Sequence, residues 1–268
     1  RLDWGDLPDD SVARPGYAPQ TYPTQYADNG PRHIILTGNN PTLGSRVDAE
    51  TNGQPTYLAN GDDINSSTNG IGIGLPDDDE DGVTFSGPLV PGETVIITVT
   101  ALAIASGGAD GYLNAWLDLN ANGLFDAGEQ IFTNTAITAG GQAIVSVAVP
   151  LGAAQGITTY SRFRFSSQQN LQPTGLAADG EIEDHPIPIV PLDWGDLPSG
   201  PYPTLSANNG PRHIIDGTHL GSRVVDGLDA KGQHDVAHPL LVVRVAEQRK
   251  DLDLKIPRID DRLQFALD

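Results

Sequence analysis

The sequence predicts an all-β protein: an antiparallel β-sandwich with long ordered loops, followed by a partial second repeat and a β-rich C-terminal tail. Three observations lead to this prediction. Short runs of β-branched and aromatic residues are separated by clusters of turn-forming residues, segments with a helical period are scarce, and motifs from the N-terminus recur near residue 192. The first two features are typical of β-sandwiches, and the third indicates a tandem repeat.

The expected strands follow a long region that is rich in loops. Residues 1–82 contain many Pro, Gly, Asn and Asp residues, which predicts ordered loops with short strands. From Val83 onward the pattern becomes that of strands, which are expected at 94–100, 112–117, 130–133, 143–149 and 160–165. Helix is expected only as a turn at 151–155.

Three motifs occur twice in the chain. Leu2–Pro8 recurs as Leu192–Pro198, Asn29–Ile35 as Asn209–Ile215, and Leu43–Val47 as Leu220–Val224. The similarity fades after Asp229, and no second strand core follows. The sequence therefore predicts three segments, which are a β-sandwich at 1–190, a partial second repeat at 191–230 and a strand-rich tail at 231–268.

The tail differs from the rest of the chain in charge and in pattern. It holds all three lysines (Lys231, Lys250 and Lys255), and its basic and acidic residues balance. Period-two segments at 240–245, 252–256 and 263–267 are expected to form strands with unpaired edges. A partial repeat this short buries too little surface to fold alone, so we expect it to dock, either on its own chain or on a neighbour.

The segment from Asp118 to Glu129 has the spacing of a calcium-binding loop. Side-chain oxygens stand at loop positions one, three, five, nine and twelve, a glycine stands at position six, and position seven offers a carbonyl. Strands are expected on both sides, so we expect a structural clamp. The alternative is a polar β-turn rich in Asn and Gly. The predicted ligands of Ca2+ are Asp118, Asn120, Asn122, Leu124, Asp126 and Glu129.

Two acidic runs flank the strand-rich region. Asp77–Asp81 precedes the first strong strand, and Asp179–Asp184 follows the last. Adjacent carboxylates repel one another unless water or a cation neutralises them. Two explanations stay open: the runs are solvated surface loops, or one of them folds back toward residues 118–129 and creates a shared or second calcium site.

The charge balance restricts the partners of the protein. The 268 residues include 35 acidic and 15 basic ones, for a net charge of -20. No nucleic-acid partner is expected because phosphate binding requires a basic face, and no membrane insertion is expected because no apolar run is long enough. The chain begins at Arg1 without a Met, which fits a mature secreted protein, and an acidic calcium-binding β-protein suits the cell exterior.

Enzymatic activity is not expected. Cysteine is absent, which excludes thiol catalysis, and no Gly-x-Ser-x-Gly motif is present. The repeated residues His33 and His213 are expected to make structural bonds to a neighbouring Asp. Trp4 and Trp194, which are also equivalent in the repeat, are expected to plug the sandwich.

A set of motifs in fixed order carries a resemblance to a known family. These motifs are Asp3–Pro8, Asn29–His33, Asp78–Val83, Asp118–Gly123 and Asp179–Asp184. Residues 1–190 resemble the GEVED domain of bacterial secreted and cell-surface proteins, with Gly180–Asp184 as the motif that gives the family its name, and a partial second copy starts near residue 192. The resemblance implies a β-sandwich accessory module that occurs in tandem in large extracellular proteins and has no catalytic activity.

The leading functional hypothesis is an extracellular structural protein that is stabilised by calcium. It would form a homo-oligomer or homopolymer, such as a surface filament or sheath, through its partial repeat and tail. The alternative is an adhesive or carbohydrate-binding accessory module of a larger secreted protein, with a glycan or cell-surface partner. This alternative requires an exposed aromatic strip, for which Tyr17, Tyr22 and Tyr26 are the candidates.

Overall fold

The computed structural model describes residues 1–218 and 220, apart from residues 13, 20 and 62–78. The strands expected in the tail, at 240–245, 252–256 and 263–267, lie outside the described residues, as does the expected boundary near residue 230. No helix in the described residues is long and apolar enough to cross a membrane.

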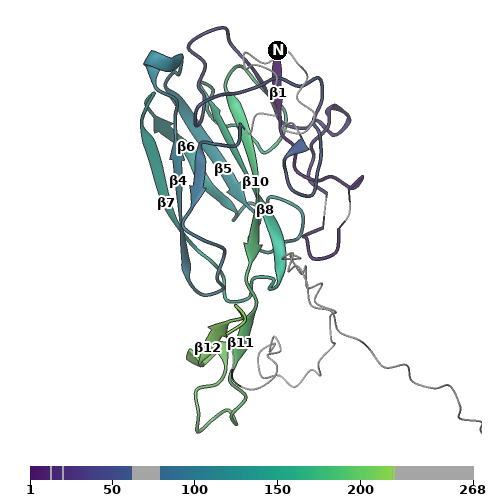
Figure 1. Ribbon diagram of the computed structural model, residues 1–268, viewed down its shortest axis with the longest axis vertical. Helices are drawn as coiled ribbons and strands as arrows, with labels where there is room; N and C mark the ends of the chain where they lie inside the picture. Colours follow the sequence, from purple (N-terminus) through teal and green to yellow (C-terminus); the bar gives the residue numbers. More distant parts are fainter. Residues whose placement is uncertain (13, 20, 62–78, 219, 221–268) are drawn as a thin grey trace, which may run out of the picture. The chain divides into compact units, whose positions relative to one another are not determined.

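Two antiparallel sheets form a β-sandwich (Figure 1). One sheet has the strand order β10-β8-β5-β6, and the other has the order β3-β4-β7. The all-β sandwich predicted from the sequence is therefore confirmed. The strands are β3 (Val83–Phe85), β4 (Thr94–Thr100), β5 (Gly111–Leu117), β6 (Gln130–Ile137), β7 (Gln142–Ala148), β8 (Ile157–Ser166) and β10 (Glu181–Ile189).

The apolar core lies between the two sheets because alternate residues of each strand face inward. In β4, Val95, Ile97 and Val99 are buried, whereas the residues between them are more exposed. Full burial of one such side chain contributes about 1.5–3 kcal/mol. The same cluster contains side chains from the facing sheet, including Leu113, Leu117, Phe163 and Phe165.

A third, smaller layer covers the outer face of β8 and β10. β1 (Leu2–Trp4) pairs antiparallel with β2 (Arg32–Ile34), which pairs in parallel with β9 (Leu176–Ala177). The layer is bonded to β10, because the backbone N–H of Ile182 donates to the Asp3 carboxylate at 2.7 Å. β8 is consequently buried on both faces over most of its length.

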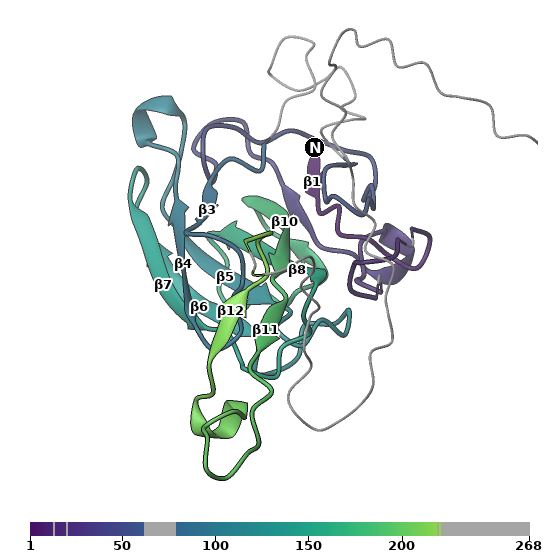
Figure 2. The same ribbon diagram turned by 60° about the horizontal axis from the view of Figure 1, so that its bottom comes forward.

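The residues after β10 repeat the first hairpin. β11 (Leu192–Trp194) pairs with β12 (Arg212–Ile214) in the register of β1 and β2, so that Asp193 faces His213 just as Asp3 faces His33. A 3-10 turn lies between the strands in both copies, at Tyr26–Asp28 and at Ser206–Asn208. Figure 2 shows the second hairpin with this turn in its connecting loop. A further 3-10 turn, Ile104–Ser106, follows β4.

Each strand expected between residues 94 and 165 is present, and β6 and β8 are longer than expected. The turn expected at 151–155 is present, with the N–H of Ala153 bonded to the carbonyl of Pro150. The alternation of apolar residues that predicts the other strands does not predict β10, because the sequence of β10 contains charged residues and the prolines Pro186 and Pro188. Prolines are tolerated there because β10 is an edge strand of its sheet.

Candidate functional site

The loop predicted to bind calcium connects β5 to β6. Gly123 has a φ of +84°, a conformation that suits glycine, and it provides the sharp turn expected at position six. The carboxylate of Asp118 is fully buried and points into the loop. It accepts hydrogen bonds from the backbone N–H groups of Asn122, at 3.2 Å, and Gly123, at 2.9 Å. The first predicted ligand therefore organises the turn.

The last predicted ligand closes the loop from its other end. One oxygen of Glu129 accepts the N–H groups of Leu119 and Asn120, at 2.9 and 3.2 Å, and the other accepts the N–H of Asp126 at 2.8 Å. Burial raises the pKa of Glu129, and the nearby charge of Asp118 adds to this effect. A bound cation would act in the opposite direction, because it favours the ionised carboxylate.

The remaining predicted ligands lie within the same turn. The side-chain amides of Asn120 and Asn122 donate to one oxygen of Asp126, at 3.0 and 2.9 Å. The N–H of Leu124 donates to the side-chain oxygen of Asn122 at 2.9 Å. The structure therefore brings all six predicted residues together in one hydrogen-bonded loop.

The donor set of this loop suits a hard cation such as Ca2+, because it consists of carboxylate, amide and carbonyl oxygens. Within the part of the chain that the structure describes, no group of three or more His, Cys, Asp or Glu side chains could hold a metal ion by itself. Binding at this loop would thus use the oxygens of Asn120, Asn122 and Leu124 in addition to its three carboxylates.

The loop is also tied to the N-terminal part of the chain. The Tyr22 hydroxyl donates to Asp118 at 2.5 Å, and the Thr21 hydroxyl donates to the carbonyl of Gly123 at 2.7 Å. Burial raises the pKa of Tyr22, and the charge of Asp118 adds to the shift. A rigid loop would therefore hold this segment against the sandwich.

The three tyrosines named as candidates for an exposed aromatic strip, Tyr17, Tyr22 and Tyr26, are not all exposed. Tyr22 is 1% exposed and Tyr17 is partly buried, whereas Tyr26 is 69% exposed. Tyr17 and Tyr22 both pack against the ring of Tyr160, at 6.3 and 5.5 Å between ring centroids. Tyr17 and Tyr22 therefore serve the packing between the N-terminal segment and β8, and of the three candidates Tyr26 alone is exposed.

The acidic run Gly180–Asp184 starts the edge strand β10, where side chains alternate between two faces. Glu181 and Glu183 lie on the inner face, opposite Phe165 and Phe163 of β8, whereas Asp184 lies on the outer face. Gly180 has a φ of +105°, and a Cβ atom there would collide with the carbonyl oxygen of Phe165. The run is consequently a buried strand and not a solvated loop.

The inner carboxylates bind backbone donors of segments that cross the edge of the sandwich. Glu181 accepts the N–H of Leu43, and Glu183 accepts the N–H of Gly82 at 2.8 Å. The second oxygen of Glu183 bonds to the ring of His185 at 3.1 Å. These carboxylates attach two loops to β10, which is an edge strand of its sheet. They accept hydrogen bonds from backbone N–H groups of those loops, so these donors are satisfied without a neighbouring strand.

The other acidic run lies in the same neighbourhood. Asp79 accepts the N–H of Asp48 at 3.0 Å, and Asp81 accepts the N–H of Ser45 at 2.7 Å. Asp81 directly precedes Gly82, which is bonded to Glu183. The described part of the first run therefore meets the second run at the edge of β10, which is a different neighbourhood from the loop at 118–129.

Glu181 has no charged partner of opposite sign in this group of described residues. It is fully buried, and its Oε1 atom has no hydrogen-bond partner. Burial raises the pKa of Glu181 well above its ordinary value, and the charges of Glu183, Asp3 and Asp79 add to the shift. Burial also raises the pKa of Glu183, although the bond to His185 opposes this. Burial therefore favours the neutral, protonated form of Glu181.

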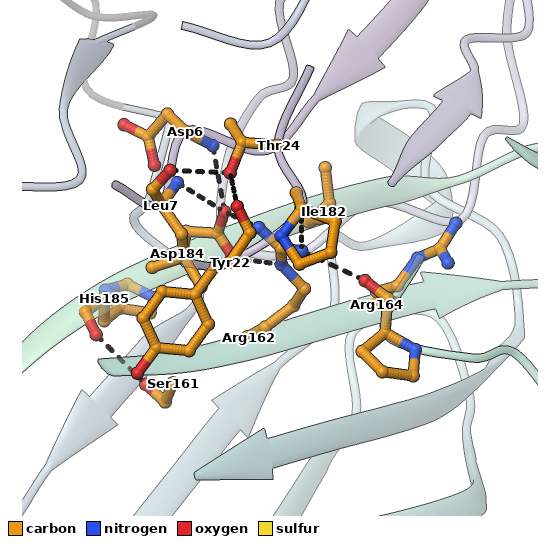
Figure 3. Close-up of polar contacts among 12 residues, drawn as sticks. Asp6, Leu7, Tyr22, Thr24, Ser161, Arg162, Arg164, Ile182, Asp184 and His185 are labelled. Carbon is orange, nitrogen blue, oxygen red and sulfur yellow. Dashed lines mark hydrogen bonds and ion pairs between the residues drawn. The ribbon is translucent and has the colours of Figure 1, made fainter. Parts of the chain in front are cut away.

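The outer face of β10 and β8 holds a buried ion pair (Figure 3). Arg162 and Asp184 form two parallel bonds of 2.7 and 2.8 Å, and both side chains are fully buried. Asp184 also accepts the N–H groups of Asp6 and Leu7, at 2.9 and 3.1 Å. The remaining terminal nitrogen of Arg162 donates to the carbonyl of Pro23. The pair thus fastens the N-terminal layer to the sandwich.

Arg164 makes a second connection of this kind. It donates to the carbonyls of Gln172, Thr174 and Gly175, and its Nε atom donates to the Nε2 atom of His33 at 3.0 Å. Burial lowers the pKa of Arg164 to about 9, which still leaves it charged at neutral pH. The loop before β9 is therefore bonded to β8.

The partner of His33 is an aspartate, as expected, but the bond is made to the backbone of that residue. Nδ1 bonds to the backbone carbonyl of Asp179 at 2.7 Å, so Nδ1 carries the proton and Nε2 accepts from Arg164. Burial lowers the pKa of His33 well below its ordinary value, and the charge of Arg164 adds to this. His33 is thus a neutral connector with a structural role, although it bonds to a backbone carbonyl and not to a carboxylate.

Trp4 is buried, but it does not plug the space between the two sheets. It lies outside the apolar cluster of the sandwich and packs in the outer layer, with the Arg32 guanidinium 5.2 Å from its ring. Trp194 has the same arrangement with Arg212, at 5.6 Å, although it is only partly buried. Both tryptophans belong to their hairpins.

The sequence reasoning missed Arg162 and Arg164. The sequence pattern that could have revealed these two arginines is the alternation Arg162-Phe163-Arg164-Phe165, in a strand that lies centrally in the predicted fold. Two arginines on one face of a central strand indicate a covered polar face, because an arginine is seldom fully buried without partners.

Comparison with known proteins identifies one family. A model of the GEVED domain matches residues 112–188, which run from β5 to β10. This part of the chain therefore matches the GEVED family. It contains the loop at 118–129, both arginines and the acidic strand β10. The match is narrower than the expected range of 1–190, and it does not include the second copy expected from residue 192. Neither the curated proteins nor the solved structures give a match to the chain.

Replacement of Glu181 by Gln is expected to stabilise the protein at neutral pH. Because the pKa of Glu181 is raised on folding, the folded state holds its proton longer than the unfolded state, and stability falls as pH rises above about 4.5. The Gln side chain cannot ionise, so the variant does not lose stability in this way. Its free energy of unfolding should exceed that of the wild type by on the order of 1 kcal/mol at pH 7, and the difference should vanish near pH 4. Thermal unfolding from pH 4 to 8 measures this gain.

The exposed residue Asp28, replaced by Asn, provides the matched control and should show no such pH dependence. A Glu181→Gln variant that is less stable than the wild type at pH 7 would contradict this account, because it would mean that the carboxylate is ionised and held by a positive charge.

Replacement of Asp184 by Asn is expected to destabilise the protein by about 3–5 kcal/mol, because it leaves the buried Arg162 without its counter-charge. Urea unfolding at pH 7 measures the cost. Replacement of the exposed Asp10 by Asn should change stability by no more than about 0.5 kcal/mol. A cost below about 1 kcal/mol for Asp184→Asn would show that the ion pair does not hold the layers together.

Proposed function

We propose that this chain is a structural protein of the cell exterior, a GEVED β-sandwich module that is stabilised by calcium and joined to other modules of its type. The observation that carries the proposal is how the GEVED domain uses its polar residues. Charged side chains of β8 and β10 are buried and bonded to backbone groups or to one another, as for Arg162, Arg164 and Asp184. Such side chains serve architecture.

Calcium would bind at the loop between β5 and β6. Its ligands would be Asp118, Asn120, Asn122, Leu124, Asp126 and Glu129, in an all-oxygen set. Because Tyr22 and Thr21 bond to this loop, an ion there would strengthen the attachment of the N-terminal segment as well as the loop. The ion would act as a structural clamp between layers of the module.

A homo-oligomer or homopolymer, such as a filament or sheath, is the larger structure that we propose for the chain. A hairpin that is folded but lacks a covering sandwich supports contact with another module. Sedimentation velocity of the full chain over a range of concentrations, in millimolar calcium, tests this part of the proposal. Growth in size with concentration is expected, and a single monomeric species throughout would contradict self-assembly.

Thermal unfolding with and without calcium tests the clamp. The wild type should become more stable with calcium, by about 2.7 kcal/mol when the free ion is 100 times its dissociation constant. Asp126→Asn should lose most of this gain, because it removes one of the charges of the loop. The exposed Asp110, replaced by Asn, should respond to calcium as the wild type does. A wild-type protein whose unfolding temperature ignores calcium would contradict the proposal.

A further inference from the structure

The second hairpin reproduces the internal bonds of the first. The Thr24 hydroxyl donates to the carbonyl of Leu7 at 2.6 Å, and the Thr204 hydroxyl donates to that of Leu197 at 2.9 Å. Asn29 and Asn209 both end their 3-10 turns with a φ of +54°. The hairpin at 192–214 is therefore formed in the same conformation as the hairpin that covers the GEVED sandwich.

The two hairpins differ in what they bury. Leu7 and Tyr22 are 0% and 1% exposed, whereas their counterparts Leu197 and Tyr202 are 55% and 50% exposed. The sequence around both pairs is otherwise alike, with Leu-Pro and Tyr-Pro-Thr in each copy. Large apolar side chains at matching positions are thus covered in one hairpin and open to solvent in the other.

The first hairpin gains its cover from the outer face of β8 and β10. The Asp3 carboxylate accepts the N–H of Ile182, His33 accepts from Arg164, and the N–H of Leu7 bonds to Asp184 (Figure 3 shows the last of these). This face supplies a fixed set of hydrogen-bond partners, and Tyr160 of β8 packs against the ring of Tyr22.

The second hairpin carries the same complementary groups without that face. Asp193, Leu197 and His213 stand at the positions of Asp3, Leu7 and His33. Among the residues that the structure describes, none of these three makes the corresponding bond to a sandwich strand.

The face of its own sandwich is closed to the second hairpin. β1 and β2 already occupy it, and each chain holds two hairpins but one such face in its described residues. In addition, β10 ends at Ile189 and β11 starts at Leu192, so the connection is too short for the second hairpin to fold back along β10.

We propose that the hairpin at 192–214 docks on the outer β8–β10 face of another GEVED sandwich, one whose face is free of a hairpin of its own. The partner is defined by its chemistry: two arginines at alternate positions of a central strand, with an aspartate opposite on the edge strand. Asp193 and His213 would take the places of Asp3 and His33, and Leu197 and Tyr202 would become buried. The inference rests on the proposed role of the chain as a module joined to others of its type. A second copy of this chain has its first hairpin on this face, so a homo-oligomer would form through other surfaces.

An extended chain tests this inference. In this extended chain, residues 1–215 are followed directly by a second copy of residues 36–190. The second hairpin then precedes a sandwich whose outer β8–β10 face is free of a hairpin. The appended sandwich should fold, resist proteolysis and protect the amide of Leu197 from hydrogen exchange, as the N–H of Leu7 is held in the first copy. In a parallel version, residues 9–21 replace residues 199–201, which restores the longer loop of the first copy.

Leu197→Asp is the decisive variant, because Leu197 is exposed in the chain as it stands. In the extended chain it should shorten the proteolytic lifetime of the appended sandwich at least tenfold. The change to Asp at the appended counterpart of Ile104, which is 67% exposed in the first copy, should leave that lifetime unchanged. An appended sandwich that folds in neither version, or that ignores Leu197→Asp, overturns the inference. Neither result affects the calcium response, which tests the proposed function separately.

Discussion

The buried pair of Arg162 and Asp184 is the interaction on which the architecture depends. A β-sandwich needs apolar residues only between its sheets, but here the central strand β8 also carries two arginines on its other face. Buried charges are costly unless every donor and acceptor is satisfied. The N-terminal layer supplies these partners, since Asp184 holds the N–H groups of Asp6 and Leu7, and Arg162 holds the carbonyl of Pro23. The third layer is therefore a requirement of the charged face and not an appendage.

The acidic strand β10 solves a related problem at the edge of the sheet. An open edge exposes unpaired backbone groups, and proteins usually protect it. Here the alternation of side chains sends Glu181 and Glu183 inward, where they bind backbone N–H groups of crossing loops, and sends Asp184 outward to the ion pair. Each acidic residue of the GEVED motif thus has a separate structural task. Its glycine permits the tight approach to Phe165.

Much of the fold could be predicted from the sequence, because β4 to β8 follow the alternation of apolar residues and the ligand spacing locates a real turn at Gly123. Three features could not. The strand β10 could not be predicted because its inward-facing residues include charged ones. The burial of Tyr22 depends on contacts with the distant Asp118. The role of Arg162 depends on a layer that the N-terminal part of the chain contributes. Periodicity reports burial by apolar neighbours, whereas these features depend on pairing between polar groups far apart in the chain.

The central claim is that the N-terminal layer is an integral part of the GEVED sandwich, held by the buried pair. Amide hydrogen exchange of the wild-type protein, followed residue by residue, tests it most directly. The account predicts that the N–H groups of Asp6 and Leu7 exchange as slowly as those in the middle of β8, because they open only when the whole domain unfolds. Exchange of these two amides many times faster than that of β8, under conditions where the sandwich stays folded, would contradict it.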